Sequence, residues 1–87
     1  MKIGGYIRGK TRTADDSQVI TLIYHTLKNS EIIGVTGMDE ELLLRRVSER
    51  LAELRLEYQQ SQLDNCLTKL ISKKVLIRNN EGKVELV

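Results

Sequence analysis

The C-terminal third of the chain combines an amphipathic helix pattern with a strand–turn–strand pattern, and no spacer separates the two. Its apolar residues recur at i, i+3, i+4, i+7 and i+8, the spacing of one helix face. They are Leu63, Cys66, Leu67, Leu70 and Ile71. Apolar residues follow at 75–77, a polar turn at 79–82 and a second, largely apolar segment at 83–87. The sequence therefore predicts a helix over residues 59–73 and then a β-hairpin.

Two further helical patterns lie upstream. The first begins at Asp15 or Asp16, whose carboxylates can accept hydrogen bonds from the free N–H groups of a first turn, and it ends at residues 28–30. The second has Thr36 or Asp39 as its N-cap and runs to about Leu54. The predicted buried stripes are Val19, Ile20, Ile23, Tyr24 and Leu27 in the first helix, and Leu43, Leu44, Val47, Leu51 and Leu54 in the second.

The segments between these helices carry weaker signals. Residues 32–35 are short, apolar and β-branched, which favours a small strand that adds to the C-terminal hairpin. Residues 55–58 fit a connecting turn as well as a prolonged second helix, so both readings stay open. Three helices followed by a hairpin in 87 residues predict one α+β domain with a small antiparallel sheet.

The composition agrees with one small globular domain that has an aliphatic core. Aromatic residues are limited to three tyrosines, so Leu, Ile and Val must fill the core, and the single cysteine excludes an internal disulfide framework. No apolar run approaches the roughly 20 residues that a membrane-spanning helix needs. Because the N-terminus also lacks the apolar segment of a secretory signal, we expect a cytoplasmic protein, or a nuclear one in a eukaryote.

Charge is distributed unevenly along the chain. The net charge is +4 over residues 1–13, −4 over residues 14–58 and +2 over residues 59–87. Residues 1–14 contain three glycines and no helical period, which predicts a flexible basic N-terminal arm ahead of a domain over residues 15–87. The basic residues of this arm suit phosphate contacts, and the candidates are Arg8, Lys10 and Arg12. An ordinary leader without a binding role is the alternative.

The chain lacks the residue combinations that catalysis and metal binding require. It has one histidine, His25, and one cysteine, Cys66, whereas zinc sites need clustered Cys and His ligands. No glycine-rich segment follows a strand and opens onto a Lys-Ser or Lys-Thr pair, as a phosphate-binding loop requires. No nucleophile stands in a pattern with a base and an orienting group. We therefore expect no enzymatic activity, no metal and no cofactor.

The outward face of the third helix is the strongest candidate for a binding site. It carries amides, hydroxyls and lysine, whereas the outward face of the second helix is mainly Arg and Glu. Asn and Gln can pair with adenine edges, and Lys suits guanine or phosphate. The candidate residues are Gln60, Ser61, Gln62, Asn65, Thr68, Lys69 and Lys73, with Arg78, Asn80 and Lys83 on the hairpin. A solvated helix face and an ordinary polar turn are the alternatives.

The order of helix, short strand, helix, turn, helix and hairpin over residues 16–87 resembles the winged helix-turn-helix superfamily. The resemblance implies sequence-specific binding of double-stranded DNA, with the third helix in the major groove and the hairpin, or wing, on the backbone. It implicates Gln60, Gln62, Asn65, Lys69, Lys73, Arg78, Asn80 and Lys83. The expected protein is a small transcriptional regulator, or a plasmid- or phage-type factor, that acts as a homodimer on a two-fold site.

A second pattern is similar to the C-terminal winged-helix domain of cullins. It consists of residues 23–28, residues 47–54 and residues 63–87. In that family a lysine at the end of the first helix accepts a ubiquitin-like modifier, and Lys28 falls near this position. The alternative function is therefore a protein-interaction module that does not bind DNA and docks through the acidic second helix or the apolar residues of the arm.

Overall fold

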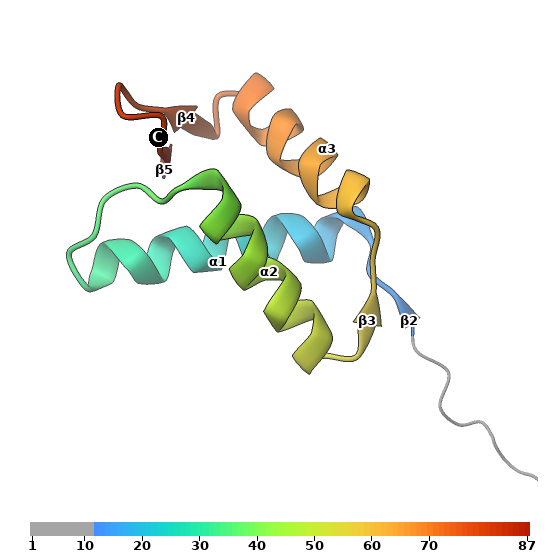
Figure 1. The fold of residues 1–87 in the computed structure, drawn as a ribbon. Coiled ribbons are helices and arrows are strands. Elements are labelled where there is room, and N and C mark those ends of the chain that lie inside the picture. Colours follow the sequence, from blue (N-terminus) through green and yellow to red (C-terminus); the bar gives the residue numbers. More distant parts are fainter. Residues whose placement is uncertain (1–11) are drawn as a thin grey trace, which may run out of the picture.

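The computed structural model describes residues 12–87, which form three helices and two small sheets. The helices are α1 (Asp16–Ile32), α2 (Glu40–Glu53) and α3 (Gln60–Ser72). Figure 1 shows α2 and α3 packed on α1, with the hairpin of β4 (Leu76–Arg78) and β5 (Val84–Leu86) beyond the end of α3. The α+β class predicted from the sequence is confirmed.

The core lies where the three helices meet, and it is aliphatic as predicted. Its buried residues come from all three helices and the hairpin, together with Ala14 before α1 and Met38 before α2. The most deeply buried ones are Val19, Ile23, Leu27, Leu43, Val47, Leu51, Leu63, Cys66, Leu67, Leu76 and Val84. Two predicted core residues are instead exposed, Tyr24 by 44% and Leu54 by 49%. Leu54 caps the C-terminus of α2, where the chain turns away at Arg55, and Tyr24 lies at the flank of α1 with its ring edge against His25.

Helix α1 begins where the sequence predicts but ends later. Asp15 and Gln18 form a reciprocal capping box, in which each side chain accepts a hydrogen bond at 2.9 Å from the backbone N–H of the other. At the other end, Gly34 adopts a φ of 89°, its N–H donates to the carbonyl of Glu31, and the N–H of Val35 donates to that of Ser30. This left-handed glycine closure continues the helix past the expected end.

The predicted strand at residues 32–35 is wrong for that reason, because the segment completes and caps α1. Met38, rather than residues 32–35, pairs with the hairpin: its N–H and its carbonyl both form hydrogen bonds of 2.8 Å with the backbone of Val84. The backbone order across this end of the domain is therefore Met38, β5 and β4, with β4 and β5 antiparallel. The predicted hairpin itself is confirmed, and its turn closes at Gly82 with a φ of 78°.

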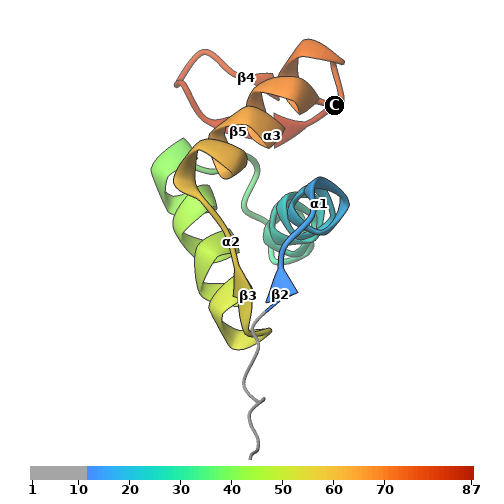
Figure 2. The same ribbon diagram turned by 90° about the vertical axis from the view of Figure 1, so that its right-hand side faces the viewer.

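A second, parallel pair of strands joins residues far apart in the sequence. β2 (Arg12–Thr13) pairs with β3 (Leu56–Glu57), which follows the turn at Arg55. Figure 2 shows this pair between α1 and α2, below the N-terminal end of α3. Residues 55–58 are thus a turn and a strand rather than more helix. The predicted boundary of the arm needs correction as well: Arg12 and Thr13 form a strand and Ala14 is buried, so they belong to the domain.

Candidate nucleic-acid interface

Helix α3 turns one polar row away from the domain. Its buried side holds Leu63, Cys66, Leu67 and Leu70. The opposite side carries the exposed residues Ser61, Asn65, Thr68 and Ser72, which we call the α3 row. Within residues 12–87, no hydrogen bond or ion pair joins any of these four side chains to another residue. Their donors and acceptors are therefore available to a ligand.

Gln62 has a different role from the one predicted for it. Its amide Nε2 donates to the backbone carbonyl of Ala14 at 2.8 Å and to Asp16 Oδ1 at 3.2 Å, and its side chain is half-buried. Because these bonds fasten α3 to the chain entering α1, the structure gives Gln62 a tethering position. Its donor is already engaged within the fold.

Asp16 is the centre of this tether. Its carboxylate accepts from Gln62 and lies 4.0 Å from the ammonium of Lys69, another predicted contact residue. Burial raises the pKa of the Cys66 thiol, and the nearby carboxylate of Asp16 raises it further, so the thiol stays protonated. The side of α3 that faces α1 is therefore structural. The sequence showed Asp16 only as a helix-start acid and gave no signal for this role.

Acidic groups flank the α3 row on both sides. A hollow of about 800 Å³ at the N-terminal end of α3 is lined by the carboxylates of Asp16 and Glu57 together with Asn65. On the α2 side, a smaller hollow is lined by three carboxylates, those of Asp64, Glu40 and Glu41, and by one cation, Arg45. Because carboxylates repel phosphate, these two hollows disfavour a nucleic-acid backbone, and the C-terminal end of the row is the more favourable side for it.

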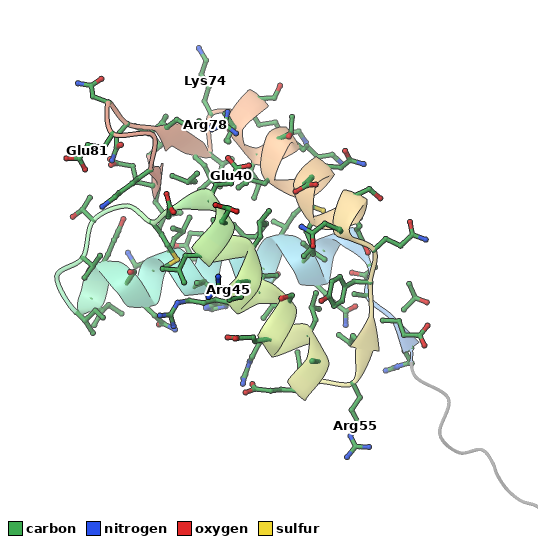
Figure 3. The ribbon with its side chains drawn as sticks, in the orientation of Figure 1. Glu40, Arg45, Arg55, Lys74, Arg78 and Glu81 are labelled. Atoms are coloured by element: carbon green, nitrogen blue, oxygen red, sulfur yellow. The ribbon has the colours of Figure 1, made fainter. Side chains whose placement is uncertain are left out.

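Cations gather at that C-terminal end. Lys73 and Lys74 are exposed and form no ion pair with the rest of residues 12–87. Figure 3 shows Lys74 projecting away from the ribbon, whereas Arg78 on β4 turns toward Glu40. The Arg78–Glu40 ion pair spans 2.7 Å, so this predicted wing contact is engaged within the fold.

The remaining predicted residues are spread over the surface. Gln60 and Asn80 are exposed, and Lys83 lies 4.0 Å from Glu81 and lines a different surface, between α1 and α2. Arg12 is exposed on β2, while Arg8 and Lys10 lie outside the described residues. Lys28 is exposed on α1, one turn before that helix ends. The structure thus brings together the α3 row, Lys73 and Lys74, and leaves the wing residues apart.

Residues 12–87 contain neither a candidate metal site nor a candidate membrane span. In this part of the chain no group of three or more Cys, His, Asp or Glu side chains is placed to hold a metal ion. Across residues 12–87 there is also no helix with the length and apolar character needed to cross a membrane. No family model, curated protein or solved structure matches the chain.

Proposed function

We propose that this chain is a winged-helix domain that binds double-stranded DNA through α3. The element order supports the proposal, since α1, the Met38 ladder position, α2, α3 and the β4–β5 hairpin follow one another as in that architecture. The parallel β2–β3 pair is an addition to this order, and it holds the chain before α1 beside the start of α3.

The α3 row is the observation that carries the proposal. Ser61, Asn65, Thr68 and Ser72 recur along one exposed helix face, and none is used by the fold. A helix of this width fits the major groove, where amide and hydroxyl groups can distinguish base edges. Asn65 lies near the middle of the row, where a docked helix comes closest to the bases. Specificity would therefore depend chiefly on Asn65.

Phosphate contacts would come from the cations around the row. Lys73 and Lys74 are at its C-terminal end, and Arg12 is near its N-terminal end, with Arg8 and Lys10 preceding it in the sequence. Each neutralised phosphate contributes about −0.9 to the slope of log K against log salt, so three to five contacts give a slope of about −2.7 to −4.5. Since residues 12–87 carry one more acid than base, we expect modest affinity for random DNA.

The proposal is tested by selecting duplexes from a random library and titrating the best one with salt. The wild type should enrich a defined sequence and show the slope given above. Replacing Lys73 and Lys74 by Gln should reduce the magnitude of the slope by about 2. The matched control, Lys28→Gln, changes an exposed lysine on α1 and should leave the slope unchanged. No enrichment, together with no binding at ~50 mM salt, would contradict DNA binding.

As a transcriptional regulator, or a plasmid- or phage-type factor, the protein would act by occupying its site. Two copies on a two-fold site would each place one α3 in successive major grooves. Sedimentation equilibrium with and without the selected duplex measures the stoichiometry. A 2:1 complex on a palindromic sequence supports the dimer, and a 1:1 complex on an asymmetric sequence opposes it.

A further inference from the structure

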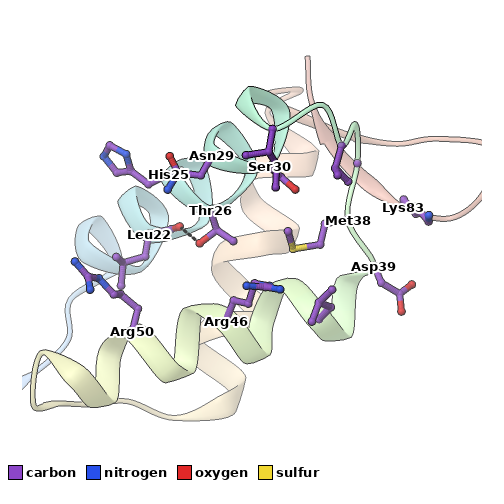
Figure 4. Close-up of a pocket in the computed structure, with 14 residues that line it drawn as sticks. Leu22, His25, Thr26, Asn29, Ser30, Met38, Asp39, Arg46, Arg50 and Lys83 are labelled. Carbon is purple, nitrogen blue, oxygen red and sulfur yellow. Dashed lines mark hydrogen bonds between the residues drawn. The ribbon is translucent and has the colours of Figure 1, made fainter.

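A second surface, independent of α3, lies between α1 and α2. It is an open groove of about 990 Å³, lined by residues of α1, of the α1–α2 connection and of α2, with Gly37 and Lys83 at one end. No residue of α3 contributes to it. Its apolar lining consists of Leu22, Ile33, Val35, Met38 and Leu42. Figure 4 shows Met38 and Leu22 between the two helices.

The apolar side chains that the α1–α2 connection contributes to this groove are unusually exposed to solvent. Ile33 is 76% exposed and Val35 48% exposed, and Leu42 opens to the same side. Connections between helices are usually polar because they face water, and clustered exposed apolar groups mark interaction sites. The left-handed glycine closure at Gly34 fixes the backbone on either side of it, so Ile33 and Val35 are held in one defined arrangement.

Cations line the same groove. Arg46 and Arg50 are one turn apart on α2, and Figure 4 shows both beside the apolar residues. Arg46 forms no ion pair with any described residue, and the Arg50–Glu53 pair at 2.9 Å is exposed on both sides. Lys83 adds a third cation, whereas Asp39 is the one carboxylate among the lining residues. The groove therefore has a positive rim around an apolar floor, and its α1 side also carries the polar residues His25, Thr26, Asn29 and Ser30.

We propose that this groove binds an acidic amphipathic helix of a partner protein. The partner's apolar side chains, at i, i+3 or i+4 and i+7, would pack on the exposed Ile33, Val35 and Leu42, above the largely buried Met38. Its carboxylates would pair with Arg46 and Arg50. A helix about 10 Å wide with an apolar face is the kind of element that an open groove between two helices can hold.

The chemistry of the floor favours a protein over a nucleic acid. Bases in single strands stack on aromatic rings, and the groove offers aliphatic side chains with only the imidazole of His25. A phosphate backbone would use the arginines but gain nothing from the floor. Since the groove and the α3 row come from different elements, both ligands could be bound together.

The probe is a 15-residue synthetic peptide, helical by design, with leucines at i, i+4 and i+7 and glutamates beside them. The chain contains only two methionines, Met1 and Met38. Labelling their methyl groups for NMR therefore gives one reporter in the groove. The peptide should shift the Met38 resonance saturably, and a version with lysines in place of the glutamates should bind at least about tenfold more weakly.

Two neighbouring arginines provide the matched variants. Arg46 faces the groove, whereas Arg45, one residue earlier on α2, lines the other side of that helix. Arg46→Glu should weaken peptide binding by about tenfold or more, with Arg46→Gln intermediate, and Arg45→Glu should leave it within about twofold. Thermal melting of each variant verifies the fold. DNA binding by Arg46→Glu should be unchanged, so a failure here is distinguishable from a failure of the proposed function.

Three results would overturn the proposal. The first is no saturable Met38 shift at ~1 mM peptide, a concentration far above the dissociation constant expected for a helix in a fitted groove. The second is an equal loss for Arg45→Glu and Arg46→Glu, which would show non-specific attraction. The third is an Arg46-dependent Met38 shift caused by a single-stranded oligonucleotide and not by the peptide, which would make the groove a nucleic-acid site.

Discussion

Gln62→Ala separates a structural role for this side chain from a base-reading role. The substitution removes the hydrogen bonds from Nε2 to the Ala14 carbonyl and to Asp16. An ordinary hydrogen bond contributes about 1 kcal/mol net to stability. The hydrogen bond to the Asp16 carboxylate contributes less than a buried hydrogen bond to a charged group would, because Asp16 is exposed. The carbonyl of the buried residue Ala14 also loses this side-chain donor. We therefore expect the free energy of unfolding to fall by about 1–2 kcal/mol.

Urea unfolding followed by circular dichroism measures this change, and Gln60→Ala is the control. Gln60 has the same side chain on the same helix, but that side chain is exposed and forms no hydrogen bond with the described residues, so its loss should cost less than about 0.5 kcal/mol. Below its melting transition, Gln62→Ala should keep the sequence preference of the wild type. Equal stabilities of the two variants, or an altered base preference for Gln62→Ala, would refute the tether.

Three further substitutions or measurements test the fold. Leu67→Ala should lower the free energy of unfolding by about 2–5 kcal/mol, since Leu67 is buried in the core, and a loss under ~0.5 kcal/mol in urea unfolding would contradict that packing. Lys74→Gly should raise the free energy of unfolding by about 0.5–1 kcal/mol because Lys74, just after the C-cap of α3, has a left-handed φ of 62°, and a loss of stability would oppose this. The raised pKa of Cys66 means that the unfolded thiol ionises first, so stability should fall as pH rises above the ordinary thiol range near 8.5. Cys66→Ala should abolish that fall, and an unchanged pH profile would contradict it.

The elements that could be predicted from sequence are those with strong local signals. The apolar period through Leu63, Leu67 and Leu70 gave α3 to within one residue at each end, because that stripe packs on the core. Asp15 caps the start of α1, as its carboxylate ahead of the apolar stripe indicates. The strand predicted at residues 32–35 was wrong because β-branched residues favour strands. The left-handed conformation of Gly34, which closes α1, is seen only in the backbone geometry.

The features that could not be predicted depend on contacts between distant segments. The pairing of Arg12 with Leu56 joins residues 44 positions apart and has no local pattern. Gln62 lies at the edge of the outward face, and only the position of Ala14 makes it a tether. Arg46 and Arg50 have the spacing of a solvated charged face, and the packing of α1 on α2 turns them into one side of an apolar groove.

The most direct test of the central claim compares Asn65→Ala with the wild type on two duplexes, the selected site and a random sequence. Fluorescence anisotropy at fixed salt should give a loss of about 1–3 kcal/mol on the selected site and little change on the random one, because Asn65 would read a base. The control Asn29→Ala, an exposed asparagine on α1, should bind both duplexes like the wild type. Equal losses on both duplexes, or none on either, would contradict base recognition by the α3 row.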